Sequence, residues 1–227
     1  DIIAQHGNLK SYGIATYWPG AYKLPAEDGV ALENAGKYHR DSNGDAHMRI
    51  AVPHLPRIAN FDDLDPLAAE DGVELLLIKP GQVIPGDCDL VVLPGSKSTL
   101  ADLRFLKDQG WDVDIAAHYR RGGHVIGICG GYQMLGRMVH DPDGVEGQPG
   151  SETGLGLLDI ETVMAGDKTL RKTEAVTVGD DRGIAENIAL WGYEIHMGQT
   201  NGPDRSRSWL QFGGPSDGVL DGAISAD

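Results

Sequence analysis

The sequence contains few cysteines and no long apolar stretch. Of its 227 residues, only Cys88 and Cys129 are cysteines, too few to serve as a disulfide framework for a chain of this length. We therefore expect free thiols and a reducing, cytoplasmic location. No window approaches the roughly 20 apolar residues of a membrane helix, and no signal peptide is recognisable. The first residue is Asp rather than Met, so we expect the chain to have been cut, processed or only partly observed.

Basic residues are also scarce. The chain has 19 Lys and Arg against 34 Asp and Glu, a formal net charge of −15. An acidic surface repels phosphate backbones and anionic lipids. We therefore expect neither a nucleic acid nor a membrane as partner.

Short runs rich in Val, Ile and Leu alternate with helix-like segments over the middle of the chain. The runs lie at 48–58, 73–80, 89–95 and 124–131, and the helix-like segments at 60–71, 98–110 and 112–123. Continuous apolar runs are typical of strands that are covered on both faces. This predicts an α/β fold with a mostly parallel sheet flanked by helices.

The two ends of the chain have a different pattern. From Gly154 onward, strand-like pieces separated by turns predict antiparallel additions to the sheet. Residues 1–47 are irregular and end in the polar stretch "HRDSNGDAH", which predicts a linker and a domain boundary there. We expect Trp111 and Trp191 to be core residues.

The stretch "GICGG" places Cys129 between an apolar run and the helix-like segment "YQMLGRMV" (132–139). A nucleophile elbow has this form, because glycines allow the backbone to turn sharply from strand to helix. A following helix N-terminus favours a thiolate, and the N–H of Gly130 can face an oxyanion. A buried structural cysteine is the alternative, and this stretch alone leaves both open.

The stretch "LPGSKST" (93–99) looks like a phosphate loop but lacks its spacing. Aligned on Lys97 and Ser98, the two glycines of that motif are replaced by Val91 and Ser96. Gly95 and Ser96 could instead supply a second oxyanion donor opposite Cys129. A helix N-cap made by Ser96 or Ser98 is equally compatible with the stretch.

Several motifs taken together resemble a known family. They are "IAVPHLPRIANFDDLDPL", "VVLPGSKST", "GICGGYQMLG", "GLGLLDIET", "GYEIHMGQT" and "DGAISAD". In this order they resemble the glutamine amidotransferase domain of the cobyric acid synthase family, the cobalamin-pathway branch of the class I, triad-type glutamine amidotransferases. "NFDDLDPL" and "GYEIHMG" are specific to this branch. The resemblance implies the flavodoxin-like arrangement of that class.

The resemblance covers residues 48–227 and implies an amidotransferase domain that is truncated at its C-terminus. "LPAEDGVAL" (24–32) resembles the last part of the preceding synthetase domain. Residues 1–47 would then be the end of an ATP-dependent synthetase domain and a linker. ATP and Mg are expected on that domain, and no cofactor is expected in this chain.

The resemblance also implies site roles. Cys129 would attack the side-chain amide of glutamine, form a thioester and release ammonia. Gly95 or Ser96, together with Gly130, would donate to the oxyanion, and Gln133 would help to hold the glutamine.

The ammonia would amidate peripheral carboxylates of a corrin substrate, adenosylcobyrinic acid a,c-diamide, to give cobyric acid. Two rival interpretations stay open. One is a related amidotransferase with another acceptor, either like cobyrinic acid a,c-diamide synthase or cell-wall amidating. The other is a catalytically silent docking domain.

The sequence offers more than one role for the histidine nearest to the predicted site. His196 and Glu194 are two apart in "GYEIHMG" and would share one face of a strand. We expect Glu194 and His196 to be substrate-binding residues, with His196 shaping the site or the interface that faces the corrin substrate. The alternatives for His196 are a structural histidine or the base itself. In the resembled family the catalytic histidine belongs to a later G-x-Y-x-H-G motif, so we expect it beyond Asp227. No set of side chains has metal-ligand spacing, and we expect no metal site.

Overall fold

The computed structural model describes residues 48–166, 169–179, 185–213 and 218–226, together with the isolated residues Gly7, Lys10 and Thr16. The chain divides into two compact units, Asp1–Asn34 and Ala35–Asp227, and every element below belongs to the second. Apart from those three isolated residues, the stretch 1–47 lies outside the described residues. Its assignment to a synthetase domain and linker stays a prediction.

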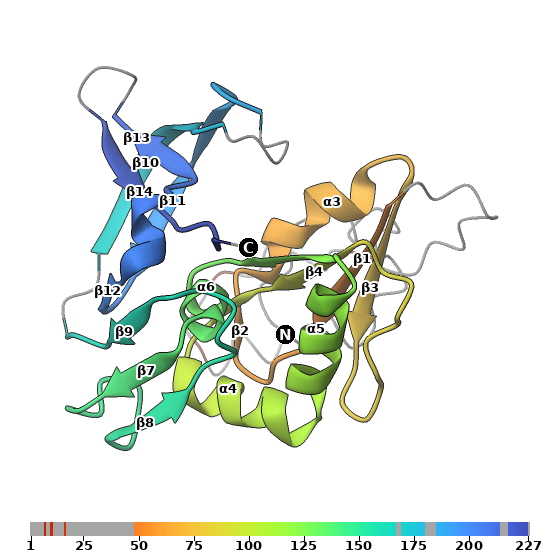
Figure 1. Ribbon diagram of the computed structural model, residues 1–227, viewed down its shortest axis with the longest axis horizontal. Coiled ribbons are helices and arrows are strands. Elements are labelled where there is room, and N and C mark those ends of the chain that lie inside the picture. Colours follow the sequence, from red (N-terminus) through yellow and green to blue (C-terminus); the bar gives the residue numbers. More distant parts are fainter. Residues whose placement is uncertain are drawn as a thin grey trace. The chain divides into compact units, whose positions relative to one another are not determined.

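Four parallel strands form the central sheet in the order β3-β1-β4-β6 (Figure 1). Their bounds are β1 Met48–Pro53, β3 Val73–Ile78, β4 Leu90–Leu93 and β6 His124–Gly127. Ile50, Val52, Val91 and Leu93 are almost completely buried, as expected for strands covered on both faces. The predicted parallel sheet is confirmed.

Helices follow the strands where the sequence predicts them. They are η2 Phe61–Leu64, α3 Asp65–Ala69, α4 Thr99–Asp108, α5 Trp111–Arg120 and α6 Gly130–Leu135. Gly110 separates α4 from α5 with φ 74°, a left-handed conformation that glycine adopts without strain. Trp111 is fully buried and donates from Nε1 to the carbonyl of Gln82 at 2.7 Å. The expectation for Trp111 is confirmed.

The helix-like segment at 132–139 is only partly helical. Helix α6 ends at Leu135, and residues 138–141 form strand β7. Gly136 has extended backbone, and a Cβ there would lie 2.7 Å from the carbonyl oxygen of Ile160. Arg137 N–H donates to that same oxygen at 2.8 Å. Pairing with a distant segment therefore ends the helix one turn earlier than the apolar pattern predicts.

The C-terminal strands are largely antiparallel, as predicted, but they form sheets of their own. One has the order β12-β9-β7-β8, in which β7 and β9 are parallel, and the other has the order β11-β10-β13-β14. The first comprises β7 Met138–Asp141, β8 Gly150–Thr153, β9 Glu161–Val163 and β12 Gln199–Asn201. The second comprises β10 Thr169–Thr177, β11 Ala189–His196, β13 Leu210–Phe212 and β14 Val219–Asp221.

Three short elements complete the described part. Strands β2 (Ile58–Ala59) and β5 (Gly95–Ser96) pair with each other, and the 3-10 helix η3 spans Pro203–Ser206. None of the helices in the described ranges is both long enough and apolar enough to cross a membrane.

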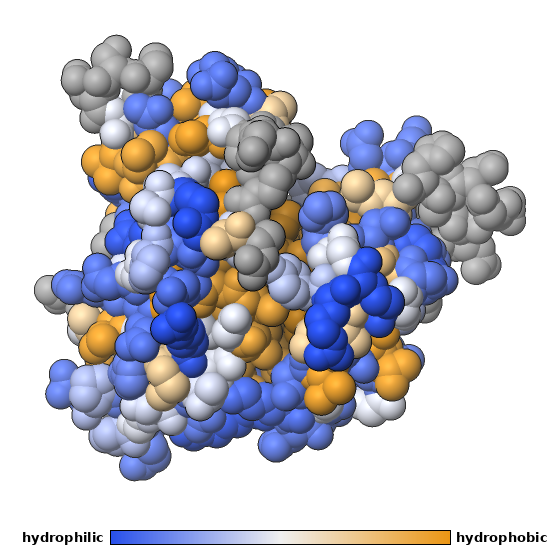
Figure 2. All heavy atoms as spheres, in the orientation of Figure 1, coloured by the Kyte–Doolittle hydropathy of each residue, from blue (hydrophilic) through white to orange (hydrophobic). Residues whose placement is uncertain are grey.

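The expectation that Trp191 is a core residue is wrong. Its side chain on β11 is 79% exposed, next to Tyr193 at 68%. Figure 2 shows hydrophobic residues reaching the surface over the sheet β11-β10-β13-β14. Sequence pattern alone could not separate this exposed strand face from a buried one, because burial depends on which elements pack against the sheet.

We expect Gly131→Ala to destabilise the protein, because an added Cβ would overlap the carbonyl oxygen of Leu93 and lie 2.8 Å from that of Pro94. Backbone atoms cannot move aside as a flexible side chain can, so the free energy of unfolding should fall by about 1–3 kcal/mol. Urea denaturation measures the change. Gly192→Ala on β11 is the matched control: its Cβ would meet nothing within 4 Å, and it should stay within about 0.5 kcal/mol of wild type. Equal losses in the two variants would contradict this interpretation.

Candidate active site

Cys129 lies on a sharp turn between β6 and α6. Its backbone has φ 51° and ψ −114°, a conformation rarely adopted by residues other than glycine. The residue is exposed, so the alternative of a buried structural cysteine does not describe it. Backbone strain of this kind is found preferentially at functional sites.

Close packing of backbone against backbone makes the turn possible. A Cβ at Gly127 would lie 2.5 Å from the carbonyl oxygen of Gly131, and Gly131 itself contacts the end of β4. Ile128 N–H donates to the carbonyl of Leu93 at 3.0 Å, which ties the turn to the same strand end. The glycines of "GICGG" therefore let α6 begin directly against the central sheet.

Gly95, Ser96 and Gly130 lie beside this turn. A Cβ at Gly95 would be 3.7 Å from the Cβ of Cys129, and a Cβ at Gly130 would be 3.0 Å from the backbone N of Ser96. The structure thus brings the backbone of "LPGSKST" against the start of α6, as the sequence predicts. Backbone N–H groups in such a position can stabilise an oxyanion.

A buried carboxyl group holds this loop. Ser96 Oγ donates to Asp102 Oδ2 at 2.6 Å, and Arg57 N–H donates to the same oxygen at 3.2 Å. Asp102 is fully buried, and this desolvation raises its pKa above the usual value. We found no signal for this role in the sequence, because a single Asp in an amphipathic helix is typical of a solvent-exposed face.

Neither predicted serine caps helix α4 in the usual way. Ser98 is at the N-cap position but makes no side-chain hydrogen bond to the helix, while Ser96 is bound to Asp102. Instead, Thr99 N–H donates to Glu146 Oε2 at 2.5 Å. Glu146 belongs to the loop between β7 and β8, and no motif in the sequence indicates its role.

Gln133 lies on α6 and is 6% exposed. Its Nε2 donates to the carbonyl of Met197 at 3.0 Å, and its Oε1 accepts from Thr99 Oγ1 at 3.2 Å. The side chain is therefore held between the start of α4 and the residue that follows β11.

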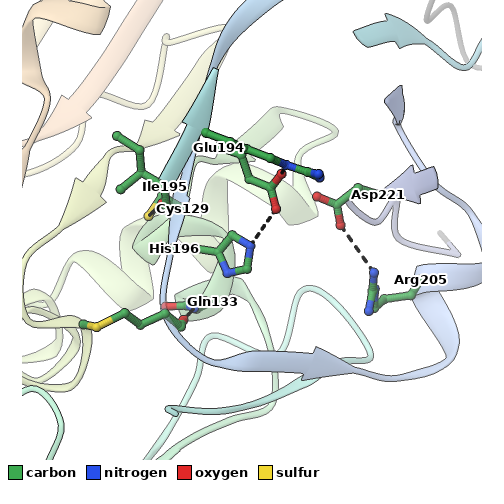
Figure 3. Close-up of polar contacts among 9 residues, drawn as sticks. Cys129, Gln133, Glu194, Ile195, His196, Arg205 and Asp221 are labelled. Carbon is green, nitrogen blue, oxygen red and sulfur yellow. Dashed lines mark hydrogen bonds and ion pairs between the residues drawn. The ribbon is translucent and has the colours of Figure 1, made fainter. Parts of the chain in front are cut away.

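The end of β11 lies beside Cys129 (Figure 3). Cys129 Sγ donates to the carbonyl of Ile195 at 3.2 Å, across 66 positions of sequence. On the same strand, His196 Nε2 lies 3.0 Å from Glu194 Oε1. Glu194 Oε2 also accepts from Arg171 Nε at 2.5 Å. The predicted pairing of Glu194 and His196 on one strand face is therefore observed.

The surroundings of Glu194 favour its ionised form. Burial alone would raise its pKa, but hydrogen bonds from His196 and Arg171 and the charge of Arg171 outweigh this effect, and the pKa is lowered. Glu194 is thus an anion, and its carboxylate contacts Nε2 of His196. The His196 side chain is 41% exposed.

The second cysteine has the opposite environment. Cys88 is 8% exposed, and desolvation raises the pKa of its thiol to about 11. The Cys88 thiol therefore has little capacity to form a nucleophilic thiolate near neutral pH. Among the described residues, no group of three or more His, Cys, Asp or Glu side chains is arranged to hold a metal ion.

Comparisons with known proteins show which family the chain resembles. The family model of the CobB/CobQ-like glutamine amidotransferase domain matches residues 49–227. Cobyric acid synthases of Ruegeria sp. (strain TM1040) and Caulobacter sp. (strain K31) are 50% and 52% identical over 227 residues. The match covers 100% of this chain but only 43% and 44% of those proteins. The chain thus spans less than half the length of these curated relatives.

A solved structure agrees at the level of the fold. PurLQS from Thermotoga maritima superimposes with a TM-score of 0.57 over 79% of this chain and 82% of that one, at 17% identity. At this identity the likeness concerns the fold alone. Since the family model covers residues 49–227, far more than half of the sequence, the chain belongs to the CobB/CobQ-like glutamine amidotransferase domain family.

Proposed function

We propose that this chain is the glutaminase part of a glutamine-dependent amidoligase, with Cys129 as its nucleophile. The observation that carries the proposal is the exposed thiol of Cys129 on a strained strand-to-helix turn, with the backbone of Gly95, Ser96 and Gly130 beside it. An exposed thiol at such a turn can reach a substrate carbonyl, and adjacent N–H groups can receive the charge that develops on oxygen.

In the proposed reaction, Cys129 Sγ attacks the carboxamide carbon of glutamine and a C–S bond forms. The carbonyl electron pair moves to oxygen, where N–H groups of Gly130 and of Gly95 or Ser96 stabilise it. The C–N bond then breaks, and the nitrogen takes up a proton and leaves as ammonia. Water hydrolyses the glutamyl thioester, which releases glutamate and restores the thiol. Gln133 holds the glutamine in place.

We propose that Glu194 and His196 shape the substrate-binding site and do not transfer protons. Glu194 already engages Nε2 of His196, and both belong to a strand face that also carries Arg171. By resemblance to the family, the general base would belong to a G-x-Y-x-H-G motif and not to β11. His196 would then face the acceptor substrate.

For the acceptor, we propose peripheral carboxylates of adenosylcobyrinic acid a,c-diamide, a corrin, which would yield cobyric acid in cobalamin biosynthesis. Support comes from relatives about 50% identical that are cobyric acid synthases. Residues 1–47 would be the end of a synthetase domain that binds ATP and Mg, and residues 48–227 the amidotransferase domain. The enzyme would be cytoplasmic.

We expect Cys129→Ala, made in the full-length protein, to lower glutaminase turnover about 10³-fold or more, because no thioester can form without the sulfur. Glutamate release measures the effect. Cys88→Ala is the matched control and should keep wild-type turnover. Wild-type turnover in Cys129→Ala would exclude the thioester mechanism, and a wild-type protein without turnover would favour a silent docking domain.

A diazoketone analogue of glutamine should alkylate Cys129 and spare Cys88. With a pKa of about 11, only about one Cys88 thiol in a thousand is a thiolate at pH 8. Peptide mass spectrometry identifies the modified residue, and free glutamine should protect it. Labelling of Cys88 in preference to Cys129 would reverse the two roles.

The location of the base leads to a separate expectation. Residues 1–227 alone should hydrolyse glutamine at least about 10²-fold more slowly than the full-length protein, because general-base catalysis contributes about that much. Ammonia release compares the two proteins. If residues 1–227 reach the full rate and His196→Gln abolishes it, His196 is the base and our assignment is wrong.

A further inference from the structure

One residue at the site is not explained by the reaction above. Glu146 lies in the loop between β7 and β8, where Val145 N–H and Glu146 N–H donate to Asp141 Oδ1 and Oδ2 at 2.7 and 2.9 Å. Asp141 is 1% exposed and therefore anchors the loop from within the protein. The anchored loop directs the Glu146 carboxyl group to Thr99, and Thr99 in turn contacts Gln133.

The direction of these hydrogen bonds follows from the donors that each group has. The Met197 carbonyl only accepts, so Gln133 must present its NH₂ group to it and its Oε1 to Thr99. Gln133 Oε1 only accepts, and Thr99 Oγ1, at 3.2 Å, has a single hydrogen to donate to it.

The contact between Glu146 and Thr99 completes the chain of hydrogen bonds. Glu146 Oε1 lies 3.1 Å from Thr99 Oγ1, the same hydroxyl that lies 3.2 Å from Gln133 Oε1. The hydroxyl has one hydrogen for these two oxygens, so both contacts are hydrogen bonds at the same time only when Glu146 Oε1 carries a proton. Glu146 Oε2 meanwhile accepts from Thr99 N–H. Burial raises the pKa of Glu146, and hydrogen bonds from Thr99 and from the backbone N–H of Leu100 lower it, while the nearby Asp141 raises it slightly. The effect of burial is the largest, so the net shift of the pKa is upward.

We propose that Glu146 is a positioning residue: as a neutral acid it donates to Thr99 and thereby orients the Gln133 carboxamide towards the glutamine substrate. The chain then runs from Glu146 through Thr99 and Gln133 to the Met197 carbonyl. It leaves the second hydrogen of Gln133 Nε2 for an oxygen of the substrate. This inference rests on the proposed function of Gln133 in binding glutamine.

Two substitutions at Glu146 separate this role from a merely structural one. Glu146→Gln retains a donor for Thr99 Oγ1 and an acceptor for Thr99 N–H, so KM for glutamine should stay within about twofold of wild type. Glu146→Ala removes both and should raise KM about tenfold, the effect of losing one oriented hydrogen bond, with kcat changed less. Thr99→Val should behave like Glu146→Ala, and Thr99→Ser like wild type.

Glu152→Gln is the matched control for loss of a carboxylate near helix α4. Glu152 on β8 pairs with Arg104 of α4 at 2.5 Å, more than one helical turn beyond Thr99. Its KM should remain that of wild type. Steady-state glutaminase kinetics of the full-length protein measure turnover. Calorimetric titration of glutamine into each variant, made on a Cys129→Ala background, measures binding separately.

The outcomes are distinct. If Glu146→Gln is as impaired as Glu146→Ala, the site needs an ionised carboxylate and the inference is wrong. If Glu146→Ala lowers the melting temperature but leaves KM and the Kd for glutamine unchanged, Glu146 only stabilises the fold and the inference is again wrong. A wild-type protein that neither hydrolyses nor binds glutamine overturns the proposed function and this inference with it.

Discussion

The candidate site depends on one steric constraint, the close approach of helix α6 to the ends of β4 and β6. Gly127 and Gly131 allow it, because a Cβ at either position would overlap backbone atoms. Where the helix begins, Cys129 has a positive φ of 51° and is exposed. The same approach places Gly130 against Ser96, so the proposed nucleophile and the proposed backbone donors are brought together by one packing contact.

Carboxyl groups set the positions of the other site residues. Asp102 holds Ser96, Asp141 holds the loop that carries Glu146, and Glu194 holds His196. Two of the three are almost fully buried, so their hydrogen bonds lie in a medium of low dielectric where geometry is tightly constrained. In this acidic chain, a few internal carboxyl groups therefore order the polar contacts of the site.

Prediction from sequence succeeded where the signal was local. The four parallel strands, the helices between them and the turn at Cys129 all follow from runs of neighbouring residues and from glycines at fixed spacing. Prediction from sequence failed where a segment's conformation depends on pairing or packing partners that are distant in the chain. Residues 138–141 form a strand because they pair with β8 and β9, and Trp191 is exposed because of how its sheet packs. Local pattern contains neither fact.

The sequence by itself determined the α/β class, the elbow at Cys129 and, through its motifs, the family, because each depends on residues close together in the chain. Only the tertiary structure decided which distant groups meet Cys129 and Gln133. Ile195, Met197, Thr99 and Glu146 reach them across long separations in sequence. The physical reason is that hydrogen bonds between remote segments exist only after the sheets and helices have packed, and no local propensity encodes them.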